Sequence, residues 1–238
     1  NPVWRFQAVR PSASSGTNAS GIELRNVQYK GRRVLKQAHI PILNVQYDND
    51  ECGPYRDWMY EETCFQASGT DIPGANGFRW CTSPPQTVFE SGQDGGNFIG
   101  VAVYEAADGS LRLLSQLSAG WYRYIPEFRF YPDGRILPRF RFGGTDNSCV
   151  CHVHHHHAFW RLDFDIITPQ NRVQEFVDGA WRAIKREAHR SRVPGEEMRW
   201  RVLHRTREIG YEIISGPDDG VADEFSGPDQ FVLRYRKG

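Results

Sequence analysis

The chain has 238 residues, and its 29 Lys and Arg residues balance its 29 Asp and Glu residues, so the formal net charge is zero. A protein that neutralises nucleic-acid phosphates needs a basic surplus or a basic block, and this sequence has neither. Apolar residues make up 39% of the chain and aromatic residues 13%, which excludes a disordered or collagen-like protein. We therefore expect one globular domain over residues 1–238 and no nucleic-acid partner.

Several features bear on where the protein acts. No run of apolar residues approaches the roughly 20 that a membrane span needs, so we expect no span. The chain begins Asn1-Pro2-Val3 without a methionine or a signal segment, which is typical of a processed or trimmed chain. Five cysteines allow up to two disulfides, and Asn18-Ala19-Ser20 is a glycosylation sequon. Together these features favour a secreted, extracellular or periplasmic protein; the alternative is a cytosolic enzyme with buried thiols.

Short alternating segments separated by turn residues predict a mainly β fold, an antiparallel β-sandwich. Strands are expected over residues 22–29, 40–47, 98–104, 111–114, 152–166, 211–214 and 231–235.

The clearest hairpin joins residues 127–130 to residues 135–142 through the turn Tyr131-Pro132-Asp133-Gly134. Because strand side chains alternate, the phenylalanines at 128, 130, 140 and 142 share one face, which we expect to be the core. The arginines at 129, 139 and 141 share the other face, which we expect to be solvated.

One segment, residues 169–187, reads as a short helix. Thr168 is a suitable N-cap and Pro169 suits the first helical position. Val173, Val177 and Trp181 recur at helical spacing after it. We expect this helix to lie against a sheet.

Two cysteines, Cys149 and Cys151, are two positions apart on an expected strand. Side chains two apart share a face, and a bridge between them would be strained. We therefore expect each to pair with a distant partner, chosen from Cys52, Cys64 and Cys81.

Histidine occupies position 152 and positions 154–157, directly before an apolar strand. On an extended chain His152, His154 and His156 project from one face, and the two odd-numbered histidines project from the other. A His-x-His pair places two imidazoles side by side at a spacing that one metal ion bridges, and imidazole suits copper or zinc. The run predicts metal binding; a solvated histidine cluster is the alternative.

A second group of interest is the segment Gly120-Trp121-Tyr122-Arg123-Tyr124. Tyr122 and Tyr124 have the same parity as the core phenylalanines of the hairpin, so both should face the interior. By residue type alone, aromatic packing would explain them.

Taken in order, these segments resemble the catalytic β-sandwich domain of the copper amine oxidases, the quinone-dependent primary amine oxidases. In that family a strand carries His-x-His followed by Arg-Leu-Asp, which His154, His156 and residues 161–163 reproduce. The family's Asn-Tyr-Asp/Glu-Tyr segment, aromatic strand and Asp-Gly turn are matched in order by residues 120–124 and by Asp133-Gly134. Further similar segments are residues 4–6, 21–22, 27–29, 31–32, 34–35, 200 and 210–211.

The resemblance implies roles for particular residues. Tyr122 occupies the position of the tyrosine that the family converts to topaquinone, which makes it the expected catalytic and cofactor residue. His154 and His156 occupy the positions of two of the family's three copper ligands. The third follows a strand that residues 231–235 resemble, where this sequence has no histidine. His152 is therefore the local candidate for the third metal ligand.

The reaction of that family also needs a carboxylate that abstracts the substrate's α-proton. Asp57, Glu61 and Glu62 lie in the plausible region, residues 55–65, and the sequence does not choose between them. The flanks of the precursor tyrosine differ from the family: Trp121 replaces an asparagine, and Arg123 replaces an acidic residue.

These departures lead us to interpret the protein as a copper-binding β-sandwich that is non-catalytic or structural. The alternative is an active primary-amine oxidase that uses Cu(II), dioxygen and a topaquinone derived from Tyr122 to deaminate a small primary amine. Copper is expected in both cases. Family members are homodimers, so the resemblance also implies a homo-oligomer.

Overall fold

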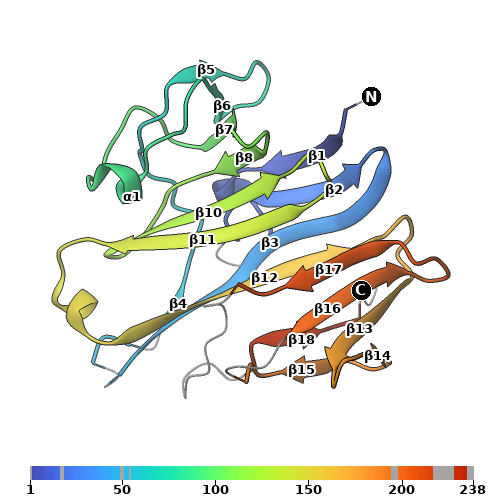
Figure 1. The fold of residues 1–238 in the computed structure, drawn as a ribbon. Coiled ribbons are helices and arrows are strands. Elements are labelled where there is room, and N and C mark those ends of the chain that lie inside the picture. The colour runs from blue at the N-terminus through green and yellow to red at the C-terminus, as the bar shows by residue number, and fades with distance from the viewer. Residues whose placement is uncertain are drawn as a thin grey trace. The chain divides into compact units, whose positions relative to one another are not determined.

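The computed structural model describes residues 2–16, 19–48, 51–53, 55–193, 198–216 and 228–234. The chain forms two compact units (Figure 1). The first comprises residues 1–31 and 37–163, and the second comprises residues 32–36 and 164–238. Asn18 of the expected sequon lies outside the described residues.

The first unit contains two sheets. One has the order β1-β2-β3-β12, with β4 paired to β3. Its strands are β1 (Trp4–Val9), β2 (Glu23–Tyr29), β3 (Arg32–Tyr47), β4 (Tyr55–Asp57) and β12 (His154–Phe164). The start of β3, residues 32–36, belongs to the second unit.

The other sheet has the order β11-β10-β8-β7-β6-β5, with β9 paired to β10. Its strands are β5 (Gly69–Asp71), β6 (Phe78–Cys81), β7 (Val101–Glu105), β8 (Leu111–Leu114), β9 (Leu117–Ala119), β10 (Tyr122–Phe130) and β11 (Ile136–Gly144). The described helices are α1 (Val88–Ser91) and the 3-10 turns η1 (Pro11–Ala13) and η2 (Ser148–Cys151). In this sheet β5–β6, β7–β8, β8–β10, β9–β10 and β10–β11 pair antiparallel, whereas β6 and β7 pair parallel. None of the helices in the described ranges is long and apolar enough to cross a membrane.

The two sheets of this unit pack face to face, which confirms the expected antiparallel sandwich (Figure 1). The hairpin forms where expected: Phe130 pairs with Ile136, and Tyr124 pairs with Phe142. The even-numbered side chains of β10 therefore point into the core, where the Phe130 ring stacks on Phe6 with a centroid distance of 4.5 Å. Burial of each such aromatic side chain stabilises the fold by about 1.5–3 kcal/mol.

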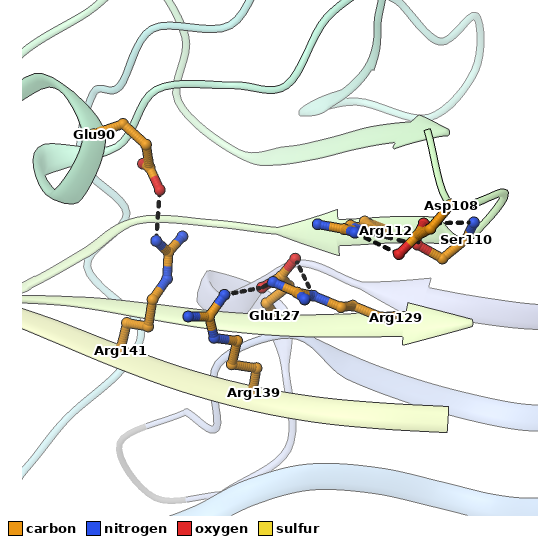
Figure 2. A network of polar contacts seen from close by, with 8 residues as sticks. All are labelled: Glu90, Asp108, Ser110, Arg112, Glu127, Arg129, Arg139 and Arg141. Atoms are coloured by element: carbon orange, nitrogen blue, oxygen red, sulfur yellow. Dashed lines mark hydrogen bonds and ion pairs between the residues drawn. The ribbon is translucent and has the colours of Figure 1, made fainter. Parts of the chain in front are cut away.

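The arginine-bearing face of this hairpin is less solvated than expected, and Figure 2 shows the contacts of its arginines with Glu127 and Glu90. Glu127 is 1% exposed and accepts two hydrogen bonds from Arg129, at 2.8 and 2.9 Å. Arg141 pairs with Glu90 of α1, and its side chain is only 14% exposed. Apolar residues from the segment 65–106 cover part of the same face and pack against Ile125. A face that alternation marks as polar is thus buried in part, because a distant segment folds over it.

The second unit contains a four-stranded sheet of order β14-β13-β16-β17 and a pair formed by β15 and β18. The strands are β13 (Asn171–Val177), β14 (Ala180–Ile184), β15 (Ala188–Arg190), β16 (Arg199–His204), β17 (Gly210–Ile214) and β18 (Gln230–Val232).

The helix expected over residues 169–187 is wrong, because this segment is the β13–β14 hairpin. Val177 pairs with Ala180, and the two turn residues Asp178 and Gly179 both have positive φ, 51° and 73°. Asp-Gly is the preferred dipeptide for a two-residue turn of this kind, because both positions must adopt left-handed backbone conformations. The apparent helical spacing therefore spans a turn, at which one strand ends and the next begins.

The cysteine prediction is half right. Cys52 and Cys149 form a disulfide across a sequence separation of 97 residues. Cys151 is an exposed free thiol, and Cys64 and Cys81 are also free. The expected pair of distant bridges fails because Cys149 and Cys151 lie in the turn η2 and not on a strand, so their side chains point in different directions.

Candidate functional site

A cluster of tyrosine and histidine side chains fills one end of the sandwich in the first unit. It consists of Tyr47 from the end of β3, Tyr122 and Tyr124 from β10, and His154 and His156 from β12; we call it the tyrosine–histidine cluster. Each strand contributes residues of one parity, as the two-residue period requires. His154 and His156 project from the same face of β12, as strand parity predicts, and that face packs against the ring of Tyr122.

Hydrogen bonds between ring groups fix the phenols. The hydroxyls of Tyr47 and Tyr122 are 2.6 Å apart, and Trp121 donates its indole N–H to the Tyr47 hydroxyl at 3.1 Å. Tyr47 is fully buried, and Tyr122 is 2% exposed. Burial and the hydrogen bond with Tyr47 raise the pKa of Tyr122, so its hydroxyl is protonated at neutral pH.

The two inward histidines lie side by side, with ring centroids 5.1 Å apart. The imidazole of His156 is stacked on Phe142 at 3.6 Å and meets the edge of Tyr122 at 4.5 Å. His154 stacks on Tyr47 at 4.9 Å. Burial, reinforced by the neighbouring histidines, lowers the pKa of His156 to about 3, so this imidazole is neutral at pH 7.

Hydrogen bonds to the Nδ1 atoms orient both imidazoles. Nδ1 of His154 lies 2.6 Å from the backbone carbonyl oxygen of His152, which can only accept, so Nδ1 carries the proton. Nδ1 of His156 lies 3.3 Å from the Tyr124 hydroxyl, which donates its own proton to Asp57 and so accepts from the ring. Both histidines therefore present an Nε2 lone pair, and Nε2 of His156 is buried with no hydrogen-bond partner among the described residues.

The structure separates the candidate carboxylates. Asp57, on β4, contacts the cluster through Tyr124, and burial raises its pKa while the hydrogen bond from Tyr124 opposes that rise. Glu61 is exposed, and its backbone carbonyl accepts a hydrogen bond from the N–H of Ser118. Glu62 is bound to the guanidinium of Arg10 at 2.7 Å. Of the three carboxylates, Asp57 is the one that this geometry brings to the cluster.

His152 does not join the other inward histidines. It caps η2, before β12 begins, and its Nε2 lies 3.1 Å from the carboxylate of Glu51 while its Nδ1 lies 3.6 Å from Asp48. Within the described ranges, no group of three His, Cys, Asp or Glu side chains is placed to hold a metal ion. The two odd-numbered histidines, His155 and His157, stack on each other at 6.2 Å.

Two residues of the site were not singled out as site residues from the sequence. Tyr47 ends the buried alternation Leu43, Val45, Tyr47, which predicts an inward ring but not its partner 75 positions away. Trp121 differs from the family's asparagine, and the sequence does not predict that its indole binds a tyrosine. Its indole N–H in fact donates to the hydroxyl that binds Tyr122.

Comparison with known proteins points to one fold. No protein-family model matches the chain, and no curated protein matches it in sequence. Among solved structures, the amine oxidase of Aspergillus nidulans matches 89% of this chain with 14% identity and a TM-score of 0.53. The copper-containing benzylamine oxidase of Hansenula polymorpha matches 94% of this chain with 12% identity and a TM-score of 0.56. The chain has the fold of these oxidases.

A third match, the lysyl oxidase of Pichia pastoris, covers 84% of this chain with 14% identity and a TM-score of 0.56. The chain spans 36%, 45% and 34% of the Aspergillus, Hansenula and Pichia proteins, respectively. Identities this low establish the similarity of fold and leave activity to be argued from the site itself.

Proposed function

We propose that this protein is a non-catalytic, copper-binding β-sandwich module that holds Cu(II) through Nε2 of His154 and Nε2 of His156. The observation that carries the proposal is the pair of adjacent imidazoles in the tyrosine–histidine cluster, one with a buried Nε2 that has no partner among the described residues. A buried polar atom without a partner costs about 1–3 kcal/mol, which a bound metal would offset. Imidazole is a favoured ligand of copper.

The groups behind the two imidazoles support the same assignment. A metal-binding histidine ordinarily donates its other ring N–H to a carbonyl or a carboxylate, which fixes the ring and raises the basicity of the ligating nitrogen. His154 has the carbonyl of His152 in this role, and His156 has the Tyr124–Asp57 pair. The donor set in the described residues fits two ligand positions; His152 would reach a third only by leaving Glu51 and Asp48.

The surroundings of Tyr122 favour a module without catalysis. Copper beside a phenol supplies the one-electron chemistry by which dioxygen oxidises such a ring. Here the Tyr122 hydroxyl is held by Tyr47, and its raised pKa keeps it protonated. The carboxylate that reaches this cluster, Asp57, accepts a hydrogen bond from Tyr124. We therefore propose that Tyr122 stays an ordinary tyrosine.

Copper uptake tests the metal site. We expect metal-depleted protein to take up one equivalent of Cu(II), measured by elemental analysis and by electron paramagnetic resonance after gel filtration. The double variant H154A/H156A should lose this uptake. The matched control H155A/H157A removes two histidines of the same run from the opposite face and should keep it. Equal uptake in both variants would overturn the proposal.

A separate variant tests the third ligand. H152A should lower copper affinity and change the resonance parameters of the bound ion if His152 leaves Glu51 to complete the site. An unchanged spectrum would remove His152 from the ligand set and leave the two-histidine assignment standing.

The second candidate is an active primary-amine oxidase with a topaquinone from Tyr122. The observation that favours it is the contact of the Tyr122 ring with His156 at 4.5 Å, with Asp57 attached to the same cluster. Aerobic incubation with Cu(II), titration with a hydrazine and mass analysis of the peptide that contains Tyr122 separate the two candidates. A hydrazone at Tyr122, absent from Y122F, would establish the quinone and make a small primary amine the expected substrate.

We also propose a secreted, extracellular or periplasmic location. The Cys52–Cys149 disulfide supports it, because disulfides persist in oxidising compartments. The homo-oligomer implied by the resemblance stays a proposal, which sedimentation velocity tests.

A further inference from the structure

Three cysteines lie together where two loops of the first unit meet. Cys52 follows β3, and it is disulfide-bonded to Cys149 in η2, directly before β12. Cys151, in the same turn, is an exposed free thiol. A disulfide thus lies two residues from an accessible nucleophile of the kind that breaks disulfides.

The disulfide ties together the two strand ends that carry the site. Cys52 is 6% exposed and belongs to the same buried group as Tyr47 and Tyr122, and Cys149 packs against that group. The backbone N–H of Asp48 donates to the carbonyl of Val153 at 2.9 Å, one residue after Tyr47 and one residue before His154. Along both loops, between the disulfide and this hydrogen bond, the carboxylate of Glu51 lies 3.1 Å from Nε2 of His152. Among the described residues, the contacts that join these loops include the disulfide, these two polar contacts and the 3.6 Å contact between His152 and Asp48.

The Cα spacing within η2 fits a second pairing. In a 3-10 turn, residues two apart have Cα atoms roughly 5 Å apart, given a rise of about 2 Å and a third of a turn per residue. Disulfides form across Cα distances of about 4.4–6.8 Å. The two side chains point in different directions in η2, so a bond between Cys149 and Cys151 forms once this short turn unwinds enough to bring them together.

We propose that Cys52, Cys149 and Cys151 form a thiol–disulfide exchange site that switches the link between these loops. The Cys151 thiolate attacks Sγ of Cys149, the Cys149–Cys151 bond forms, and the Cys52–Cys149 bond breaks. Cys52 leaves as a thiolate and takes up the proton that Cys151 released. One disulfide and one thiol are present before and after the step, so it needs no oxidant or reductant. The inference does not depend on copper binding.

The switch releases Cys52 while Cys149 stays cross-linked within its own turn. Without that bond, polar contacts such as those of Asp48 and Glu51 hold the loop that follows Tyr47 to the segment before His154. The exchange therefore alters how firmly the two sides of the tyrosine–histidine cluster are joined.

The first experiment tests whether the second pairing forms. In the full-length variant C52S, a buffer of oxidised and reduced glutathione should produce the Cys149–Cys151 disulfide, with oxidised glutathione reduced to two thiols. Non-reducing peptide mapping by mass spectrometry detects the linked peptide. The double variant C52S/C151S should show none. If C52S carries only free or glutathionylated Cys149, the proposal fails.

The second experiment follows the exchange in the unmodified chain. Protein is incubated at about pH 8.5, where thiolates are plentiful, for up to several hours, quenched in acid and labelled with a maleimide. We expect labelled Cys52 to increase with time in wild type and to stay at background in C151S. C64S, which lacks a different free thiol, should behave like wild type. Constant Cys52 labelling in wild type, or an equal increase in C151S, would overturn the proposal.

Discussion

The substitution Y47F isolates the hydroxyl at the centre of the cluster. It removes the partner of the Tyr122 hydroxyl, 2.6 Å away, and the acceptor of the Trp121 indole N–H, 3.1 Å away. The ring itself remains, so apolar burial is nearly unchanged. The variant therefore measures the hydrogen bonds and not the packing.

The magnitude follows from the two lost bonds. A net hydrogen bond contributes about 1 kcal/mol, and a buried group left without a partner costs about 1–3 kcal/mol. Tyr122 is buried, whereas Trp121 is partly accessible to water, so the penalty is larger at Tyr122. We expect Y47F to lower the free energy of unfolding by about 2–4 kcal/mol.

Urea denaturation followed by tryptophan fluorescence measures this loss, provided that the dependence on denaturant is unchanged. The matched control is Y55F: Tyr55 packs edge-on against both Tyr47 and Trp121 but is 42% exposed, and its loss should stay within about 0.5 kcal/mol. In a double-mutant cycle, Y47F and Y122F should couple by about 1 kcal/mol, because they share one bond. A loss for Y47F no larger than that of the control would refute the reasoning.

Three further predictions concern the same unit. Burial would raise the pKa of Glu23, but its hydrogen-bonding partners outweigh burial and lower the pKa to about 2. The stabilising contribution of Glu23 is therefore present above pH 4.5 and is lost as the pH falls towards 2. E23Q should remove this part of the acid sensitivity, and parallel acid-unfolding curves for wild type and E23Q would contradict the prediction. F128A truncates a fully buried ring and should lower the free energy of unfolding, measured in urea, by about 3–5 kcal/mol. The control L137A, at a side chain that is 43% exposed, should lower it by less than about 0.5 kcal/mol, and similar losses would disprove the burial assignment. Replacing both Cys52 and Cys149 by serine removes a covalent link across 97 residues and should lower the free energy of unfolding by about 2–5 kcal/mol. An unchanged melting temperature would contradict this prediction.

Local alternation was enough to predict most of the sandwich. The hairpin of β10 and β11 has the register that its turn and its phenylalanines indicated, because one slipped residue would send every apolar side chain to the wrong face. The same period placed His154, His156 and Tyr122 on inward faces. Residues 169–187 carry two conflicting signals, a helical spacing of apolar residues and an Asp-Gly turn. The Asp178-Gly179 turn determined the structure, because its two positive φ angles fit a hairpin and end a helix.

The partners of those residues were decided by tertiary structure alone. Parity states which face a side chain takes, but it does not state which distant strand lies opposite. Tyr47 meets Tyr122 across 75 positions, and Asp57 reaches Tyr124 across 67, through the packing of one sheet on the other. Likewise, His152 has the parity of a ligand but lies beside Glu51, because β12 begins only after it. Strand periodicity in the sequence determined most strands of the sandwich and the inward direction of residues such as Tyr122 and His156; the packing of the sheets determined which of those residues make a site.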